Sequence, residues 1–134
     1  MGASDTKLSI IPLGGMGEVG KNMMAIKYGA NIIVIDAGLT FPEDEMLGVD
    51  IVIPDISWLV DNRHMVLGII LTHGHEDHIG AMPFVLQEIN VPVYGSRLTL
   101  GLVKDKIGPE LASEAELISV EPRQVVKLGP FAVE

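Results

Sequence analysis

Leu67-Gly-Ile-Ile-Leu-Thr-His-Gly-His-Glu-Asp-His-Ile-Gly80 carries three of the four histidines of the chain, and these histidines follow an apolar run. The run, residues 66–71, has the length and composition of a fully buried strand, and the polar residues begin where such a strand must end. The stretch therefore predicts ligand-type side chains gathered at the C-terminal end of a buried strand. The rest of the chain is interpreted as the scaffold that holds them.

The spacing of the polar residues indicates how they would be used. His73 and His75 are two apart, so in extended backbone their rings lie on one side and can converge on one ion. His75 and His78 are three apart and share a face once the chain turns helical, whereas the adjacent Asp77 and His78 are expected to diverge. This divergence predicts two ions rather than one.

Imidazole and carboxylate donors suit zinc or manganese, and two ions about 3.5–4 Å apart would hold a hydroxide between them as nucleophile. The alternative is that these are ordinary polar loop residues. The pattern His-x-His-x-Asp-His favours a metal site, because burying four such groups without an ion would leave several unpaired. The predicted ligands are His73, His75, Asp77 and His78. The isolated His64 is predicted to be a solvated loop residue.

Asp36 ends an apolar strand predicted over residues 31–36. A carboxylate at the end of a buried strand needs a partner, and the free N–H of a metal-binding histidine is a favoured one. We therefore predict that Asp36 supports the ligands, with a plain turn residue as the alternative.

Four motifs carry a resemblance to known families. Thr72-His-Gly-His-Glu-Asp-His78 resembles the signature of the metallo-β-lactamase superfamily, whose members hold two metal ions with it. The stretches Ile11-Pro-Leu-Gly-Gly-Met-Gly-Glu-Val-Gly-Lys-Asn22 and Asp36-Ala-Gly-Leu-Thr-Phe-Pro-Glu-Asp-Glu45, with Ile53-Pro-Asp55, are more selective. They resemble the ribonuclease J family, in the β-CASP branch of that superfamily, and the likeness covers residues 8–107.

The resemblance implies an α/β fold, the N-terminal half of an αββα sandwich; the residue pattern alone also allows an open α/β sheet. It implies a zinc-dependent ribonuclease with two ions in the complete enzyme, manganese being possible. A metal-bound hydroxide would attack RNA phosphodiester bonds, in 5′–3′ exonuclease or endonuclease mode, for RNA processing and decay. Asp77 would act at the metals and Asp36 would steady the ligands. RNA is the implied partner, together with a second copy or a partner subunit in the complete protein.

Composition narrows the class of protein. A length of 134 residues with 48% apolar residues fits one globular domain with a real core. No apolar run approaches the roughly 20 residues of a membrane span and the start lacks a signal sequence, so we expect a soluble, cytoplasmic protein without membrane contact. The absence of cysteine excludes disulfides and thiolate metal sites. A net charge of −9 argues against a surface that attracts nucleic acid everywhere, so any RNA groove must be local.

A literal G-x-G-x-x-G begins at Gly15, which is also the fingerprint of dinucleotide binding. The spacing excludes that interpretation, because residues 28–31 look like a turn where a crossover helix would be needed. Residues 23–27 and 32–35 are better explained as a hairpin. The glycines would either let backbone amides approach an anion or only make a tight connection, and Asn22 would bond substrate or the loop itself.

The remaining elements are predicted from periodicity and capping residues. Asp55 is expected to cap a helical turn that carries Trp58. Ser96 is expected to cap a helix that ends at Gly108-Pro109, with an apolar stripe at Leu98, Leu102 and Val103. Strands are predicted over residues 8–13, 49–53, 91–94, 117–120, 124–128 and from 131, and a helix over 80–88.

In the resembled family a further histidine, a bridging aspartate, a last histidine and the RNA-gripping β-CASP domain come from later sequence. Residues 1–134 are therefore expected to form a single, incomplete domain, with residues 1–7 as a disordered end or a cloning remnant. We expect this chain alone to fold incompletely or associate, and not to cleave RNA. The alternatives are another hydrolase of the same fold, such as a thioesterase-like enzyme, and a non-catalytic interaction module.

Overall fold

A computed structural model describes residues 6–42, 44 and 47–134. Six strands form one sheet in the order β1-β2-β3-β4-β5-β6, the order in which they occur along the chain. Strand β2 is antiparallel to both of its neighbours, β1 and β3, while β3, β4, β5 and β6 run parallel. Their bounds are Leu8–Gly14, Met23–Tyr28, Asn31–Ile35, Val66–Ile70, Val93–Gly95 and Leu117–Ser119.

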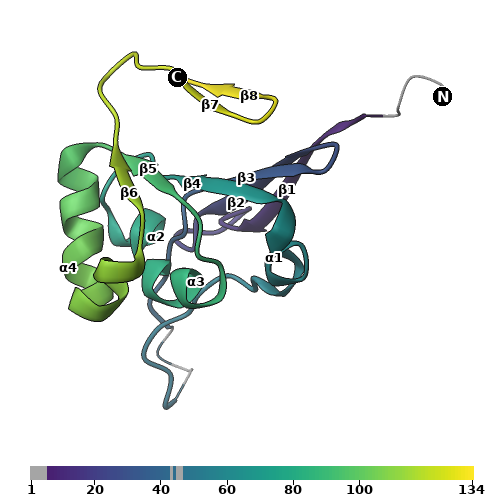
Figure 1. The fold of residues 1–134 in the computed structure, drawn as a ribbon. Helices are drawn as coiled ribbons and strands as arrows, with labels where there is room; N and C mark the ends of the chain where they lie inside the picture. The colour runs from purple at the N-terminus through teal and green to yellow at the C-terminus, as the bar shows by residue number, and fades with distance from the viewer. Residues whose placement is uncertain (1–5, 43, 45–46) are drawn as a thin grey trace.

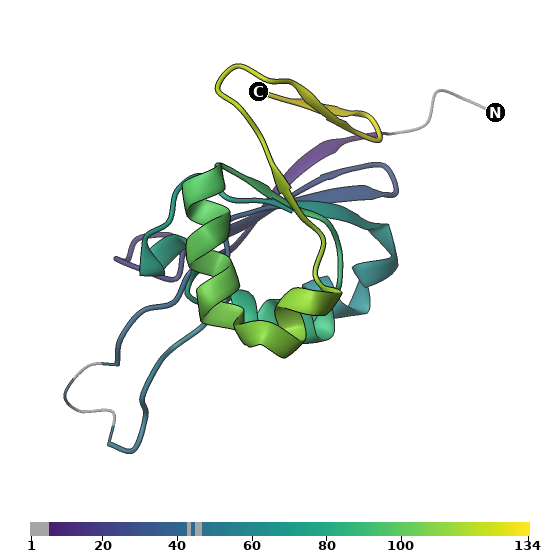
Figure 2. The same cartoon turned by 60° about the vertical axis from the view of Figure 1, so that its left-hand side comes forward.

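The helices cover one face of this sheet, and the hairpin of β7 (Val126–Leu128) and β8 (Phe131–Val133) lies on the other (Figures 1 and 2). The helical elements are α1 (Ser57–Asp61), the 3-10 turn η1 (Arg63–Met65), α2 (Glu76–Ile79), α3 (Met82–Glu88) and α4 (Arg97–Glu114). One α layer on one β layer confirms the predicted α/β class. None of the helices in the described part of the chain is long and apolar enough to cross a membrane.

The core lies between the sheet and the helices. Alternate residues of the central strands point into it, as the two-residue period of a strand requires. Ile32, Val34 and Ile69 are buried there against Met82 and Val103 of the helices. The predicted hairpin is confirmed: Tyr28 pairs with Asn31, and Gly29 between them has φ 60°, a left-handed conformation that glycine adopts without strain. Strand β2 occupies the place after Gly20 where dinucleotide binding would need a crossover helix, and it pairs antiparallel with β1, so the dinucleotide interpretation is excluded.

Two predicted helices have different bounds in the structure. In place of the one helix expected over residues 80–88, the structure has two, α2, which begins at Glu76, and α3. They are separate because Ala81, which lies between them, donates its backbone N–H to Ala37 O. Pro83 falls in the first turn of α3, where proline is tolerated. Gly108 does interrupt α4, with φ 84°, but the chain resumes its helix after the kink and continues to Glu114.

The predicted apolar stripe of α4 is wrong for two of its three residues. Val103 is buried, but Leu98 and Leu102 are 76% and 43% exposed. Leu100 and Val103 instead form the buried side of this part of the helix. Leu102 faces the loop that follows β4, because the position that a Cβ of Gly74 would occupy is 2.5 Å from Leu102 Cδ1.

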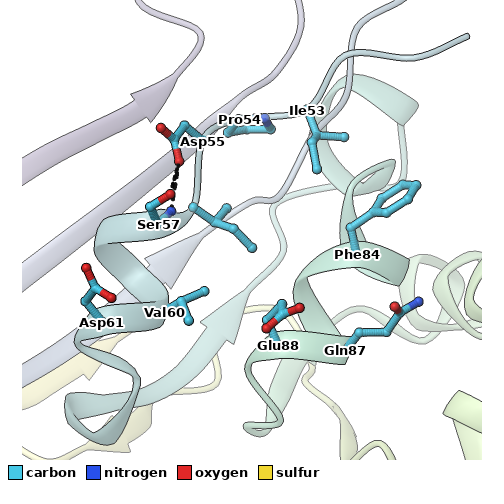
Figure 3. Close-up of a pocket in the computed structure, with 10 residues that line it drawn as sticks. Ile53, Pro54, Asp55, Ser57, Val60, Asp61, Phe84, Gln87 and Glu88 are labelled. Atoms are coloured by element: carbon cyan, nitrogen blue, oxygen red, sulfur yellow. Dashed lines mark hydrogen bonds between the residues drawn. The ribbon is translucent and has the colours of Figure 1, made fainter. Parts of the chain in front are cut away.

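Two further predictions near α1 need correction. The strand expected over residues 49–53 is only an isolated bridge, in which Val52 and Thr40 exchange backbone hydrogen bonds of 2.8 Å, because the described residues place no further strand alongside it. Ile56, not Asp55, is the N-cap residue of α1. Asp55 still binds the helix start, since its Oδ1 accepts from Ser57 Oγ at 2.6 Å and Ser57 N–H at 2.9 Å (Figure 3). These two bonds lower the pKa of the Asp55 carboxyl.

The sheet face opposite the helices is apolar and only partly covered. Leu128 of the hairpin packs there, 3.5 Å from the position of a Cβ on Gly68. Leu8, Ile10 and Tyr28, at the β1–β2 side of the same face, are 64%, 60% and 39% exposed. Exposed apolar surface of this kind commonly marks an interface.

Candidate metal centre

The predicted ligands lie where the end of β4 meets the start of α2. Leu71 N–H still pairs with Tyr94 O of the neighbouring strand, and the chain leaves the sheet immediately afterwards. His75 is the N-cap residue of α2, in extended conformation, and the helix then carries the next two predicted ligands. The histidine stretch therefore stands at the C-terminal edge of the parallel strands, where clefts of α/β proteins form.

The structure brings three of the four predicted ligands together. One donor atom each of His73, Asp77 and His78 lies within 4.8 Å of the other two. The rings of His73 and His78 have centroids 4.0 Å apart. His75 is outside this group of three, and its exposed ring stands edge-on to His73 at 4.7 Å. His64 lies exposed in η1, as predicted for a solvated residue.

The expectation that Asp77 and His78 diverge is wrong. Asp77 Oδ2 is 3.5 Å from His78 Nε2. The reason is that His78 is held by its other ring nitrogen: Nδ1 is 2.7 Å from Asp36 Oδ2. This bond turns the Nε2 edge of the ring toward Asp77. Sequence spacing could not reveal it, because it depends on a contact 42 residues away.

Asp36 makes the contact that the sequence predicted, with a histidine of the cluster. It is 5% exposed, and its φ of 64° is unusual for a residue with a side chain. The surroundings fix this conformation: Asp36 Oδ1 accepts from Thr72 N–H at 2.8 Å, and Asp36 Oδ2 from Thr72 Oγ1 at 2.8 Å. Backbone strain maintained by several contacts is typical of functional positions.

Thr72 links Asp36 to His73 and thereby indicates which ring nitrogens are available. The threonine hydroxyl has a single hydrogen, which it gives to Asp36, so it can only accept from His73 Nδ1, 3.0 Å away. The Asp36 carboxylate likewise accepts from His78 Nδ1–H. Both histidines consequently present the lone pair of Nε2, the form that binds a metal ion. Sequence analysis missed Thr72, although its place directly after the strand was a usable signal.

The glycine-rich loop and the turn after β3 hold the ligand helix from one side. Asn22 donates from both its backbone N and its Nδ2 to Asp77 O, each at 3.0 Å, and Nδ2 also lies 3.4 Å from His78 Nε2. These hydrogen bonds reach the ligand helix and not the glycine-rich loop that the sequence offered as one partner of Asn22. Gly38, in the turn after β3, also approaches the ligand helix closely: a Cβ added to it would lie 1.6 Å from Asp77 O. Sequence analysis gave no signal for Gly38.

The glycine-rich loop is itself braced by Glu18. Its Oε1 accepts from Gly15 N–H at 3.2 Å and lies 3.3 Å from Lys21 Nζ. The hydrogen bond from Gly15, followed by that from Lys21, lowers the pKa of the Glu18 carboxyl. These contacts give the glycine-rich loop a defined conformation where it leads into Asn22.

Two cavities differ in their relation to the histidines. A cavity of about 190 Å³ is lined by Gly15, Asn22, Asp36 and His78, so it adjoins the metal centre. A larger cavity, of about 540 Å³, lies between α1 and α3 and is lined by Phe84 and by acidic residues but by no histidine (Figure 3). Size alone would favour the larger cavity as the functional site. The donor geometry favours the smaller one, because metal chemistry requires convergent ligands.

The donor set fits a divalent ion. One ring nitrogen from each of His73 and His78 and one carboxylate oxygen converge within 4.8 Å, and His75 stands beside them. Zinc and manganese accept this combination of nitrogen and oxygen donors. Asp36, 7% exposed in its side chain, supplies the outer hydrogen bond that such histidines almost always have.

Comparison with known proteins agrees with this geometry. The metallo-β-lactamase superfamily profile matches residues 16–133. Ribonuclease J 2 of Staphylococcus epidermidis is 57% identical over 98 residues, 73% of this chain and 18% of that protein. Ribonuclease J 2 of Staphylococcus saprophyticus is 54% identical over 100 residues, 75% of this chain and 18% of that protein. The chain thus spans about a fifth of the length of these relatives.

Solved structures show the same fold at low sequence identity. MEM-A1, a subclass B3 metallo-β-lactamase from a soil metagenome library, aligns with TM-score 0.59 and 23% identity, covering 84% of this chain and 44% of the other. The metallo-β-lactamase fold protein YhfI from Bacillus subtilis aligns with TM-score 0.61 and 18% identity, covering 94% and 51%. The chain therefore belongs to the metallo-β-lactamase superfamily, and its predicted likeness to ribonuclease J is confirmed over about three quarters of its length.

Proposed function

We propose that this chain supplies part of the metal centre of a ribonuclease that hydrolyses RNA phosphodiester bonds in the cytoplasm. The observation that carries the proposal is the convergence of the His73, Asp77 and His78 donors, with the tautomers of both histidines set by Asp36 and Thr72. Identity of 57% to a ribonuclease J 2 supports RNA as the substrate. A thioesterase-like activity has no comparable support, because the fold alone is shared by many hydrolases.

The residues would have distinct roles. His73, Asp77 and His78, with His75, would hold one or two divalent ions, zinc being favoured by the donor set and manganese being acceptable to it. Such ions lower the pKa of water and neutralise charge on a phosphoryl group. Asp36 keeps a proton on Nδ1 of His78, and Thr72 keeps one on Nδ1 of His73, so that Nε2 of each ring stays available as a ligand. Cleavage can be exonucleolytic or endonucleolytic with the same centre.

We further propose that the domain formed here is completed by additional protein. Support comes from the exposed apolar residues on the sheet face opposite the helices, which include Leu8 and Ile10, and from the much greater length of the relatives. Three close donors also fall short of the roughly eight that two four-coordinate ions require. In the absence of that additional protein, a second copy of the chain or another subunit would cover the apolar face.

Ultracentrifugation and an RNA assay test this proposal on the chain itself. We expect self-association at micromolar concentration, and no cleavage of single-stranded RNA with added zinc or manganese. The physical reasons are the uncovered apolar face and the incomplete ligand set. A monomer that degrades RNA would show that no further protein is needed.

A chimera tests the function. The matching segment of the Staphylococcus epidermidis ribonuclease J 2 is replaced by this chain, which is 57% identical to it over 98 residues. We expect cleavage of RNA, no hydrolysis of acyl thioesters, and loss of cleavage when His73 and His75 are replaced by alanine. A chimera that folds and binds zinc but hydrolyses thioesters in place of RNA would contradict the proposal, and one that folds without binding metal would indicate an interaction module.

A further inference from the structure

Helix α4 lies against residues 71–75, the segment between β4 and α2 that is called the metal-binding loop here. Thr99, Leu102 and Lys106 are spaced three and four apart and share one face of the helix. The position of a Cβ on Gly74 would be 3.7 Å from Thr99 Cα and 2.5 Å from Leu102 Cδ1. One turn farther on, Lys106 Nζ forms an ion pair of 2.6 Å with Glu76 Oε1.

The ion pair joins α4 to the residue between two predicted ligands. Glu76 follows His75 and precedes Asp77, and it is the first residue of α2. That helix has four residues and no side-chain cap hydrogen bond, so its own hydrogen bonds cannot keep it folded. It depends on tertiary contacts, and the backbone bond from Leu39 N–H to Glu76 O provides another one.

We propose that Lys106 is a positioning residue, which acts through Glu76 to hold the metal-binding loop in the conformation that binds ions. Leu102 supports it by packing on Gly74 between His73 and His75. The inference rests on the proposed metal centre. Lys106 touches no ligand atom, and the pair is solvent-accessible, with side chains 25% and 48% exposed. Its contribution to global stability is therefore small, and its effect falls on the local geometry of the loop.

Positioning and simple electrostatics predict opposite results for one of two variants. If charge alone mattered, Lys106→Met would strengthen cation binding by removing a positive charge, and Glu76→Gln would weaken it by removing a negative one. If the pair positions the loop, each variant releases the same contact and both weaken binding. The double variant then resembles either single one, because the two residues act as a unit.

Zinc dissociation constants, from competition with a chromophoric chelator, decide between these cases. We expect about a 3–10-fold weakening for Lys106→Met and for Glu76→Gln, less than the 10–100-fold typical of buried supporting residues. Lys106→Arg, which keeps the charge, stays within about twofold of the unmutated chain. Lys104→Met is the matched control: it removes the same charge from an exposed position on the same helix and leaves the affinity unchanged. Urea unfolding of the metal-free chains should give closely similar midpoints for all variants.

Asp36→Asn separates failure of this inference from failure of the metal centre. We expect it to weaken zinc binding about 10–100-fold, because it removes the anchor of His78. If Asp36→Asn weakens binding while Lys106→Met leaves it unchanged or strengthens it, the positioning role is contradicted and the metal centre stands. If the unmutated chain binds no zinc, or Asp36→Asn has no effect, both proposals are overturned.

Discussion

Replacing both His73 and His75 by alanine is expected to weaken zinc and manganese binding about 100-fold or more. Removal of a residue that only supports a ligand already costs about 10–100-fold, and this variant removes the ligands themselves. His73 is in the group of convergent donors, and its neighbour His75 is the nearest further imidazole, with ring centroids 4.7 Å apart. The double variant therefore cannot restore the site by exchanging one ring for the other.

Metal analysis after dialysis, together with a chelator competition titration, measures this effect. His64→Ala is the matched control, because it removes an exposed histidine in η1 that belongs to no donor group in the described part of the chain. The control should bind as the unmutated chain does. Equal metal content in the double variant and the unmutated chain would show that these histidines are not ligands.

Gly38→Ala is expected to cause the largest loss of stability, of about 3 kcal/mol or more, which exceeds the usual cost of a point mutation. The added Cβ would lie 1.6 Å from Asp77 O, 2.2 Å from Asp77 C and 2.8 Å from His78 N. These are backbone atoms, which no rotamer change can move aside. The ligand helix must be displaced from the turn after β3, with loss of the hydrogen bond from Ala37 N–H to His78 O.

Urea unfolding of the metal-free chain measures this loss without reference to metal binding. Gly101→Ala provides the control, because it lies in α4 with nothing within 4 Å of the added Cβ. There alanine should leave stability unchanged or raise it by about 0.5–1 kcal/mol, since glycine is unfavourable inside a helix. An unfolding midpoint for Gly38→Ala equal to that of the unmutated chain would contradict the close approach of this turn to α2.

Local pattern was sufficient to predict the parts of the fold that depend on near neighbours. The buried strand before Thr72, the β2–β3 hairpin and the cluster of polar residues at the strand end follow from periodicity and turn residues within short windows. A contact between Asp36 and one of the clustered histidines was also predicted, because a carboxylate at a buried strand end requires a partner, but the sequence did not indicate that it would be His78.

Features set by distant contacts were not predictable from the sequence. Helical periodicity placed Leu98 and Leu102 in the core, whereas the packing of α4 buries Leu100 and leaves these two exposed. The convergence of Asp77 with His78 depends on the bond that turns the histidine ring. The requirement for glycine at position 38 arises only when the turn after β3 meets α2.

Anomalous X-ray diffraction from crystals of this chain grown with zinc or manganese tests the metal centre most directly. We predict an ion within about 2.0–2.2 Å of the Nε2 atoms of His73 and His78 and of a carboxylate oxygen of Asp77. The Asp36 carboxylate should remain on His78 Nδ1. An anomalous peak confined to other side chains, such as His64 or the acidic residues of the larger cavity, with none at these three ligands, would contradict the assignment.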